Sequence, residues 1–321
     1  MSDVVSCLLP PMRFDRAVDG LLGAGQRLAR ERGGRHIVAA AAPLDDAVRA
    51  AVSARADGVL AADNASLSEY QPEACLAALE ALCRLSGADV VLLGSDTYSQ
   101  ELTPRLAHRL GGSSAGDAQK LSLHEGRIRV TRSVYGGKAM AVIEARLFPA
   151  VIWLRARAMA PAEAGAGCEV QRVAVAVPDA LPTRITERHA EARDGVRLED
   201  ADIIISGGRG LGGPEPFEQL KDLAAAVGGQ VAASRAACDS GWVPPSWQVG
   251  QTGKKVAPEL YLAIAISGAS QHIMGIADAK VIAAVNTDSD APIFKHCRYG
   301  LVADYRNVVG PLREKLSALL T

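Results

Sequence analysis

Short apolar runs alternate with longer stretches of helical spacing along the first third of the chain, and this alternation restricts the fold more than any other feature. The apolar runs at 36–42, 58–62 and 89–94 end at Pro, Asp or Gly. Between them, 44–54 and 72–85 carry apolar residues three and four positions apart. Strands that alternate with amphipathic helices are typical of a parallel sheet covered by helices. The sequence therefore predicts an α/β protein.

Residues 128–159 have a different sequence pattern, in which β-forming residues are interrupted by residues typical of turns. This segment predicts two or three strands joined by hairpins, with Gly136-Gly137 as one of the turns. We therefore expect the first domain to combine a parallel sheet with added antiparallel strands.

The boundary between two domains is expected in residues 161–200, which are rich in Ala, Glu, Arg and Pro. We place it at Asp194, which gives an N-terminal α/β scaffold domain at 1–193 and a C-terminal domain at 194–321. The second domain opens with an apolar strand after an acidic stretch and continues with further strand–helix units. We expect these units to form a doubly wound domain.

Bulk properties exclude several classes of protein. A formal net charge of -1 argues against nucleic acid as the main partner. No apolar run reaches the roughly 18 residues that would cross a bilayer, so we expect no direct membrane span. The 6 cysteines lack a CxxC pair and predict reduced thiols, with no metal site. Because the start of the chain does not resemble a signal peptide and the composition is rich in Ala and Arg, we expect a bacterial cytoplasmic protein.

A Gly-x-Gly-x-x-Gly motif at 208–213 follows the predicted strand at 201–206 and precedes a predicted helix. Glycines in this position let the backbone approach a pyrophosphate at the start of a helix. An NAD-binding fingerprint also needs an acidic residue about 20 residues further on, where this sequence has Ser234 and Arg235. Arg235 could instead bind the phosphate of NADP. An NAD(P)-dependent oxidoreductase therefore stays open as the alternative, as does a glycine turn without a ligand.

The loop at 249–255 has some features of a phosphate-binding P-loop. Its first Gly is at the wrong distance, and Lys255 stands where Ser or Thr would bind magnesium. We therefore do not expect phosphoryl transfer.

Five blocks of sequence in the last third of the chain carry a more specific signal because they occur together and in order. The blocks are SGGRG (206–210), SRAACDSGWVP (234–244), QVGQTGKKVAPELYLAIAISGASQH (248–272), VNTDSDAPIF (285–294) and YGLVADY (299–305). Together they resemble the C-terminal domain of the alpha subunit of electron transfer flavoprotein, also called the large or FixB-type subunit. Two segments of the first domain, 95–112 and 133–155, look like the corresponding segments of the same family.

The resemblance implies FAD as the cofactor of the second domain, bound by residues of the five blocks. The implied FAD contacts are Arg209, Ser234, Arg235, Val249, Gly250, Gln251, Thr252, Ser267, Gly268, Ala269, Ser270, Gln271, His272, Asn286, Asp304 and Tyr305. Arg235, Gln251 and Thr252 would lie at the flavin ring, and Asn286 and Asp304 would hold the ADP part.

The chemistry of three of these side chains suits a flavin. Arg235 carries a permanent planar positive charge, which can stabilise negative charge on a reduced ring. Thr252 can hydrogen-bond flavin N5 without crowding it, and His272 can donate to the C2 oxygen. We therefore expect a stabilised anionic flavin semiquinone, which turns a two-electron cofactor into a one-electron carrier.

Several of the same residues also have simpler interpretations. Arg235 could pair with Asp239, Asn286 could belong to an ordinary turn, and Asp304 could cap a helix. His272 could cap the helix that follows it, although a histidine at a Gly-Ala-Ser turn is poorly suited to a core.

The resemblance implies a heterodimer with an electron transfer flavoprotein beta subunit, which carries AMP or a second FAD. The flavin would accept electrons from acyl-CoA or amine-type dehydrogenases and pass them to a quinone oxidoreductase. The sequence offers no convincing general base or nucleophile, so no catalytic residue is assigned. We therefore expect an electron carrier without its own metabolite substrate, not an enzyme.

Overall fold

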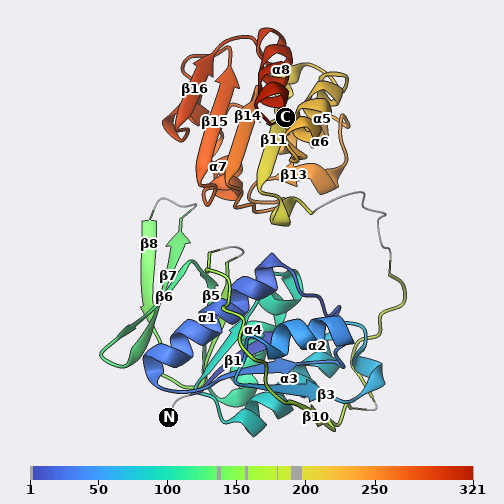
Figure 1. Ribbon diagram of the computed structural model, residues 1–321, viewed down its shortest axis with the longest axis vertical. Helices are drawn as coiled ribbons and strands as arrows, with labels where there is room; N and C mark the ends of the chain where they lie inside the picture. Colours follow the sequence, from blue (N-terminus) through green and yellow to red (C-terminus); the bar gives the residue numbers. More distant parts are fainter. Residues whose placement is uncertain (1–2, 136–138, 156–157, 179, 189–196, 321) are drawn as a thin grey trace. The chain divides into compact units, whose positions relative to one another are not determined.

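The chain folds into two compact units, Met1–Ala190 and Glu191–Thr321 (Figure 1). The computed structural model describes residues 3–135, 139–155, 158–178, 180–188 and 197–320. The boundary predicted at Asp194 lies outside the described residues and stays a prediction. Each unit is described separately below.

The first unit is built on a seven-stranded sheet in which every pair of neighbours is parallel. Its order is β10-β3-β2-β1-β4-β9-β5. The strands are β1 (Val4–Leu8), β2 (His36–Ala40), β3 (Gly58–Ala62), β4 (Val90–Leu93), β5 (Ser113–Ala118), β9 (Ala150–Leu154) and β10 (Val170–Val173). The predicted apolar runs are thus strands of one parallel sheet, and their side chains are buried on both faces.

Four helices cover this sheet: α1 (Arg16–Arg32), α2 (Asp46–Ser53), α3 (Pro72–Ser86) and α4 (Thr97–Leu110). The β1 residues alternate between two hydrophobic clusters, Val5 packing with α3 and α4 and Val4 with α1 and α2. Aspartates cap the starts of α1, α2 and α4. Helix α4 stops at Gly111, which has the left-handed conformation at φ 72° that favours glycine.

The antiparallel strands form a sheet of their own and do not extend the parallel one. This three-stranded sheet comprises β6 (Lys120–His124), β7 (Arg127–Val134) and β8 (Ala139–Glu144). The last part of the predicted hairpin region is β9, which lies in the parallel sheet between β4 and β5. A parallel partner for β9 comes from far along the chain, and local turn signals carry no information about it. The turn predicted at Gly136-Gly137 lies outside the described residues.

A buried ion pair joins β5 to the end of β9 within the parallel sheet, and one hydrogen bond connects it to the antiparallel sheet. The guanidinium of Arg155, just after β9, donates to both carboxylate oxygens of Asp117 in β5, at 2.8 and 2.6 Å, and to the hydroxyl of Ser133 in β7 at 2.8 Å. The Arg155 and Asp117 side chains are only 8% and 9% exposed. The bidentate pair holds the ends of β5 and β9 in a defined geometry, and the hydrogen bond to Ser133 connects them to β7.

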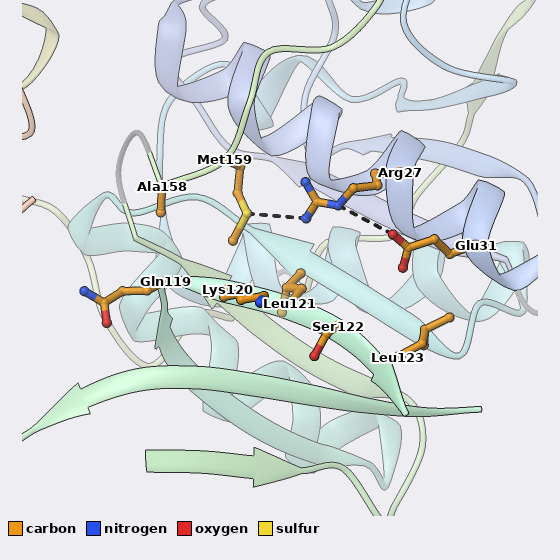
Figure 2. Close-up of a pocket in the computed structure, with 9 residues that line it drawn as sticks. All are labelled: Arg27, Glu31, Gln119, Lys120, Leu121, Ser122, Leu123, Ala158 and Met159. Carbon is orange, nitrogen blue, oxygen red and sulfur yellow. Dashed lines mark hydrogen bonds and ion pairs between the residues drawn. The ribbon is translucent and has the colours of Figure 1, made fainter. Parts of the chain in front are cut away.

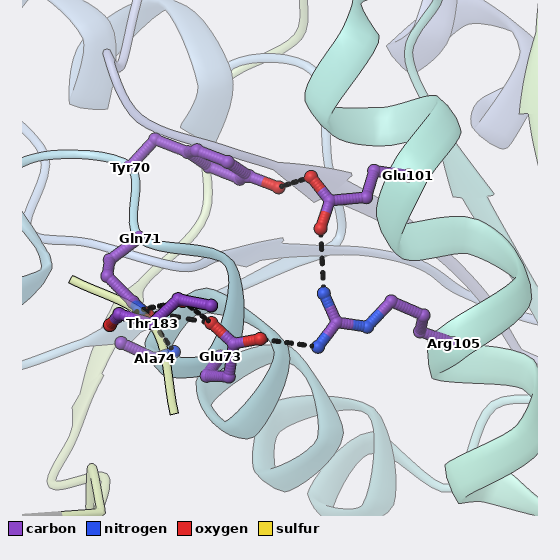
Figure 3. A network of polar contacts seen from close by, with 7 residues as sticks. All are labelled: Tyr70, Gln71, Glu73, Ala74, Glu101, Arg105 and Thr183. Atoms are coloured by element: carbon purple, nitrogen blue, oxygen red, sulfur yellow. Dashed lines mark hydrogen bonds and ion pairs between the residues drawn. The ribbon is translucent and has the colours of Figure 1, made fainter. Parts of the chain in front are cut away.

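A polar network holds the segment around Thr183 against α3 and α4 (Figure 3). The Glu73 carboxylate accepts hydrogen bonds from Thr183 Oγ1 at 2.7 Å and from Arg105 at 2.9 Å. Arg105 also contacts Glu101, which accepts from the Tyr70 hydroxyl. The hydrogen bond from Thr183, together with those from Arg105 and Gln71, lowers the pKa of Glu73 to about 2. The end of the first unit is thus fastened by charge-assisted hydrogen bonds.

The second unit is built on a six-stranded parallel sheet of order β13-β12-β11-β14-β15-β16. Its strands are β11 (Ile203–Gly207), β12 (Gln230–Ser234), β13 (Gln248–Val249), β14 (Leu260–Ile264), β15 (Val281–Asn286) and β16 (Tyr299–Val302). Helices α5 (Pro216–Ala226), α6 (Arg235–Asp239) and α8 (Val309–Leu320) pack in one hydrophobic cluster, and α7 (Ser270–Ile276) packs in the other. Counted within the unit, the strands run 3-2-1-4-5-6, so the predicted doubly wound α/β fold is confirmed.

Within the part of the chain that the structure describes, no helix is both long enough and apolar enough to cross a membrane.

Asp117→Asn should lower the free energy of unfolding of the first unit by about 3–5 kcal/mol, because it leaves the buried Arg155 charge without its counterion. Urea denaturation followed by circular dichroism measures the change. Glu144→Gln is the matched control, since Glu144 pairs with Arg127 and Arg129 at the exposed side of the antiparallel sheet. The control should leave the unfolding midpoint nearly unchanged. Equal effects of the two substitutions would contradict the role given to the buried pair.

Candidate functional site

The sixteen residues implied by the sequence resemblance all lie at or just after the carboxyl ends of the strands in the second sheet. Because the six strands are parallel, these ends share one edge of the sheet, which we call the carboxyl edge. The residues follow the strands in this way: Arg209 after β11, Ser234 and Arg235 at the end of β12, Val249 to Thr252 at β13, Ser267 to His272 after β14, Asn286 at the end of β15, and Asp304 and Tyr305 after β16. Ligands of doubly wound sheets bind at this edge.

The loops after β11 and β14 meet at the centre of the carboxyl edge. These strands are neighbours, and the chain leaves β11 toward α5 on one face and β14 toward α7 on the other. Gly208 N donates to Ile264 O at 2.9 Å, and Gly210 N donates to Ala265 O at 3.3 Å. Ala265 itself has a left-handed backbone, with φ 54°. Strained backbone of this kind is concentrated at functional sites, and this is also the switch point of the topology.

The first two glycines of the Gly-x-Gly-x-x-Gly motif are explained by this contact between loops. A Cβ on Gly208 would lie 2.1 Å from the Ala265 carbonyl oxygen, and one on Gly210 would lie 3.0 Å from the same atom. The helix that an NAD fingerprint requires at the motif is displaced, because a 3₁₀ turn at Arg209–Leu211 intervenes and α5 begins only at Pro216. The motif therefore serves packing of the loops and does not form the NAD fingerprint.

The loop after β13 is held against the first turn of α7. Gln251 N donates to Gln271 O at 2.7 Å, and Gly250 N donates to Lys254 O at 3.1 Å. Lys254 is paired with Glu199 at 3.0 Å. No helix follows the loop among the residues described there, in agreement with the expectation that it is not a P-loop. The contact brings Gln251 and Gln271 side by side.

Half of the implied residues expose their side chains at this edge, where a ligand has access to them. They are Arg209, Arg235, Gln251, Thr252, Ser267, Ala269, Ser270 and Gln271. Arg235 also makes the simpler contact considered from the sequence, with its Nε 3.2 Å from Asp239 Oδ2. The side chains of this pair are 66% and 62% exposed. Exposed ion pairs contribute little, so Arg235 can exchange Asp239 for a bound anion at small cost.

Two implied residues point inward. The side chain of Val249 is 1% exposed and belongs to the hydrophobic core. His272 is 7% exposed, so the expectation that it was poorly suited to a core is wrong. Its Nε2 lies 3.0 Å from the Tyr261 hydroxyl. Burial lowers the pKa of His272 to about 4, which keeps the imidazole neutral at neutral pH.

Three more of the implied residues already make contacts within the chain. Asn286 donates to Ile266 O at 3.0 Å and accepts from Asp288 N at 3.0 Å, which forms the turn considered from the sequence. Asp304 accepts from Arg306 N at 3.0 Å and caps a 3₁₀ turn, and its hydrogen bonds with Arg306 lower its pKa. Tyr305 donates to Leu211 O at 2.9 Å. Their contacts with a cofactor stay predictions.

Three buried polar atoms of the second unit have no hydrogen-bond partner among the described residues: Ser206 Oγ, Ser234 Oγ and His272 Nδ1. Ser206 and Ser234 stand at the carboxyl ends of β11 and β12. Buried polar atoms without partners are rare in native proteins, so each of these atoms is a candidate to bind a ligand group or a water molecule. The residues thus fit a polar cofactor at this edge. Ser206 was not among the residues predicted from the sequence. The signal that could have indicated it was a polar residue within the apolar strand before the glycine loop.

The first unit contains a hollow of about 620 Å³ between α1 and β6 (Figure 2). Arg27 crosses it, with Nη2 3.7 Å from Met159 Sδ and Nε 3.9 Å from Glu31 Oε1. None of the sixteen implied residues lines this hollow. The candidate site is the carboxyl edge of the second sheet, and the fold that carries it defines the class of the molecule as a doubly wound α/β protein.

Comparison with known proteins supplies the family. Residues 197–277 match the electron transfer flavoprotein FAD-binding domain, and residues 11–179 match the electron transfer flavoprotein domain. The chain is 37% identical over 305 residues to the electron transfer flavoprotein subunit alpha of Thermoanaerobacterium thermosaccharolyticum, covering 93% of this chain and 92% of the relative. It is 36% identical over 299 residues to the protein FixB of Clostridium saccharobutylicum, with 91% and 89% covered. Over 185 residues it is 45% identical to the alpha subunit of Paracoccus denitrificans, with 58% and 60% covered.

The chain belongs to the family of electron transfer flavoprotein alpha subunits. The resemblance drawn from the five sequence blocks is confirmed, and the second unit is a flavin-binding domain of an electron-transport protein. The NAD(P)-dependent alternative is not favoured, in agreement with the displaced helix at the glycine loop.

Gly208→Ala should destabilise the second unit by about 1–3 kcal/mol, because its Cβ would collide with the Ala265 backbone and force the two loops apart. Thermal unfolding followed by circular dichroism measures the effect. Gly310→Ala is the matched control, since a Cβ there meets nothing within 4 Å. Gly310 lies in α8, so the control should leave stability unchanged or slightly raised. A Gly208→Ala protein as stable as the control would contradict the close loop contact.

Proposed function

We propose that this chain binds FAD at the carboxyl edge of its second domain and works as the alpha subunit of a heterodimeric electron carrier. The observation that carries the proposal is the set of buried polar atoms without partners at Ser206, Ser234 and His272. They lie on the edge where a doubly wound sheet binds dinucleotides, in a domain of a flavin-binding family.

The side chains at this edge divide into groups that suit the parts of FAD. Arg209 and Arg235 are cations that can neutralise the phosphates or a reduced ring. The hydroxyls of Ser206 and Ser234 supply donors from the strand ends. Asn286 and Asp304 are proposed to hold the ADP part. When bound, the flavin supplies electron chemistry that no side chain can perform.

Arg235 is proposed to make the bound ring a better electron acceptor. Its charge is permanent, and its contact with Asp239 in the next turn of α6 is an exposed pair that can open at little cost. A cation placed where negative charge develops stabilises that charge. The expected stabilisation of the flavin at its one-electron level belongs to this proposal, as do the hydrogen bonds expected from Thr252.

The partner is proposed to be an electron transfer flavoprotein beta subunit, which carries AMP or a second FAD. Large apolar side chains of β8 and the segments beside it support this, with Tyr135 83%, Met140 56%, Val142 62% and Leu147 62% exposed. Large apolar side chains exposed close together in the sequence are typical of an interaction site. Electrons are proposed to come from acyl-CoA or amine-type dehydrogenases and to leave to a quinone oxidoreductase. In this proposal the chain turns over no metabolite of its own and works in the bacterial cytoplasm.

The purified protein, prepared together with its beta subunit, should show oxidised-flavin absorption near about 375 and 450 nm. The cofactor released by heat should be FAD when analysed by chromatography. A colourless preparation that also fails to bind added FAD would refute the proposal. Release of FMN in place of FAD would refute the assignment of Asn286 and Asp304 to an ADP part.

Arg235→Ala should reduce the fraction of flavin held at the one-electron level during stepwise reduction, which absorption spectra measure. A partly exposed charge contributes about 1 kcal/mol, or roughly a fivefold change in this equilibrium. Arg313→Ala is the matched control, because Arg313 forms a comparably exposed ion pair with Asp222 at 3.2 Å in the same unit. The control should behave as the unmodified protein. The same yield for Arg235→Ala would rule out the electrostatic role.

A further inference from the structure

A buried pair of polar side chains, Tyr261 and His272, lies beneath the carboxyl edge. Tyr261 is a residue of β14 and has no exposed surface, and its hydroxyl lies 3.0 Å from His272 Nε2 at the start of α7. The two rings are tilted by 58° with centroids 5.9 Å apart. Burying a phenol and an imidazole costs free energy that two apolar side chains of similar size would not cost. Packing alone therefore does not explain why these two polar side chains are buried together.

The first unit offers an internal comparison in His36, which is also buried, with its pKa lowered to about 4 by burial. Both of its ring nitrogens have partners: Nε2 lies 2.9 Å from Ser6 Oγ and Nδ1 lies 3.1 Å from Arg55 O. His272 has one partner, Tyr261, and its Nδ1 makes no hydrogen bond with any described residue. Of these two buried histidines, His272 is thus the one with a ring nitrogen that has no hydrogen-bond partner among the described residues.

The surroundings of His272 decide which ring nitrogen carries the proton. A neutral imidazole has one N–H, and its position depends on the hydrogen bond that the other nitrogen makes. Burial raises the pKa of Tyr261, so the phenol keeps its proton and can donate it. A phenol that donates to Nε2 makes that nitrogen the acceptor, which leaves the ring proton for Nδ1.

We propose that Tyr261 is a positioning residue that donates its hydroxyl proton to His272 Nε2 and thereby fixes the ring proton on Nδ1. The imidazole is then held in one orientation and one tautomer before any ligand arrives. Nδ1–H becomes the donor that His272 can offer to a carbonyl oxygen of the flavin. The last step rests on the proposed function, whereas the tautomer is a property of the chain itself.

Ser206 extends the arrangement by one residue. Its hydroxyl is fully buried at the end of β11, the strand next to β14, and it lies near enough to the Tyr261 phenol to lower the pKa of that group. The Ser206 hydroxyl makes no hydrogen bond of normal geometry to any described residue. It can therefore turn toward the phenolic oxygen while the phenol donates to His272. The three side chains connect the switch point to the start of α7.

Long-range proton–nitrogen NMR correlation on the full chain, labelled with ¹⁵N-histidine and free of flavin, tests the tautomer. His272→Gln identifies the His272 signals by their loss. We expect these signals in the unmodified chain to show the proton on Nδ1, as we also expect for His36. A proton on Nε2 of His272 would overturn the proposal without any need for a variant.

Tyr261→Phe removes only the hydroxyl and should release His272 into a mixture of tautomers, with a shifted Nε2 signal. Tyr70→Phe is the matched control, because it removes a phenol that donates to Glu101 in the first unit, and it should leave the His272 signals unchanged. FAD affinity should fall by roughly three- to tenfold in Tyr261→Phe, the range for one hydrogen bond. Unchanged His272 signals in Tyr261→Phe would overturn the proposal. Failure of the unmodified chain, prepared together with its beta subunit, to bind FAD would instead refute the proposed function and leave the tautomer result standing.

Discussion

The close contact between the loops after β11 and β14 is the constraint on which the second unit depends. The carbonyl of Ala265 occupies the space where a side chain at Gly208 would lie. The backbone hydrogen bonds from Gly208 and Gly210 hold the two loops together. A larger residue at Gly208 would separate the loops and move the start of α7 with them. The left-handed conformation of Ala265 is maintained by the same contact.

This contact also explains why polar atoms can remain without partners at the site. Ser206 and His272 are carried by elements that pack tightly on either side of the switch point, so neither can relax toward solvent. In the first unit the comparable buried histidine, His36, has partners at both ring nitrogens, and Asp117 and Arg155 neutralise one another. His272 in the second unit differs from His36 in having one ring nitrogen without a partner among the described residues.

The sequence predicted the strands and helices of both units well where the apolar spacing was regular. The helical spacing at 44–54 and 72–85 corresponds to α2 and α3, because apolar residues three and four positions apart form one buried face of a helix. The sequence predicted the antiparallel strands of the first unit but counted β9 among them, because the parallel partners of β9 are far from it along the chain. The expectation that His272 is poorly suited to a core was also wrong, since the burial of one histidine depends on β14 and α7 packing together. Ser206 was missed because its lack of a partner becomes visible only when its neighbours are in place.

What the sequence determined by itself is the family and the order of the site segments, because five blocks in a fixed order constrain both at once. It also provided the residue types, with Arg235 as a permanent cation and glycines at 208 and 210. Only the tertiary structure decided that the segments meet at one edge, since that follows from six parallel strands in the order 3-2-1-4-5-6. It also decided that the glycines make room for Ala265 and that Tyr261 faces His272. Such contacts join residues that are distant along the chain, so they arise from packing and cannot be read from local patterns.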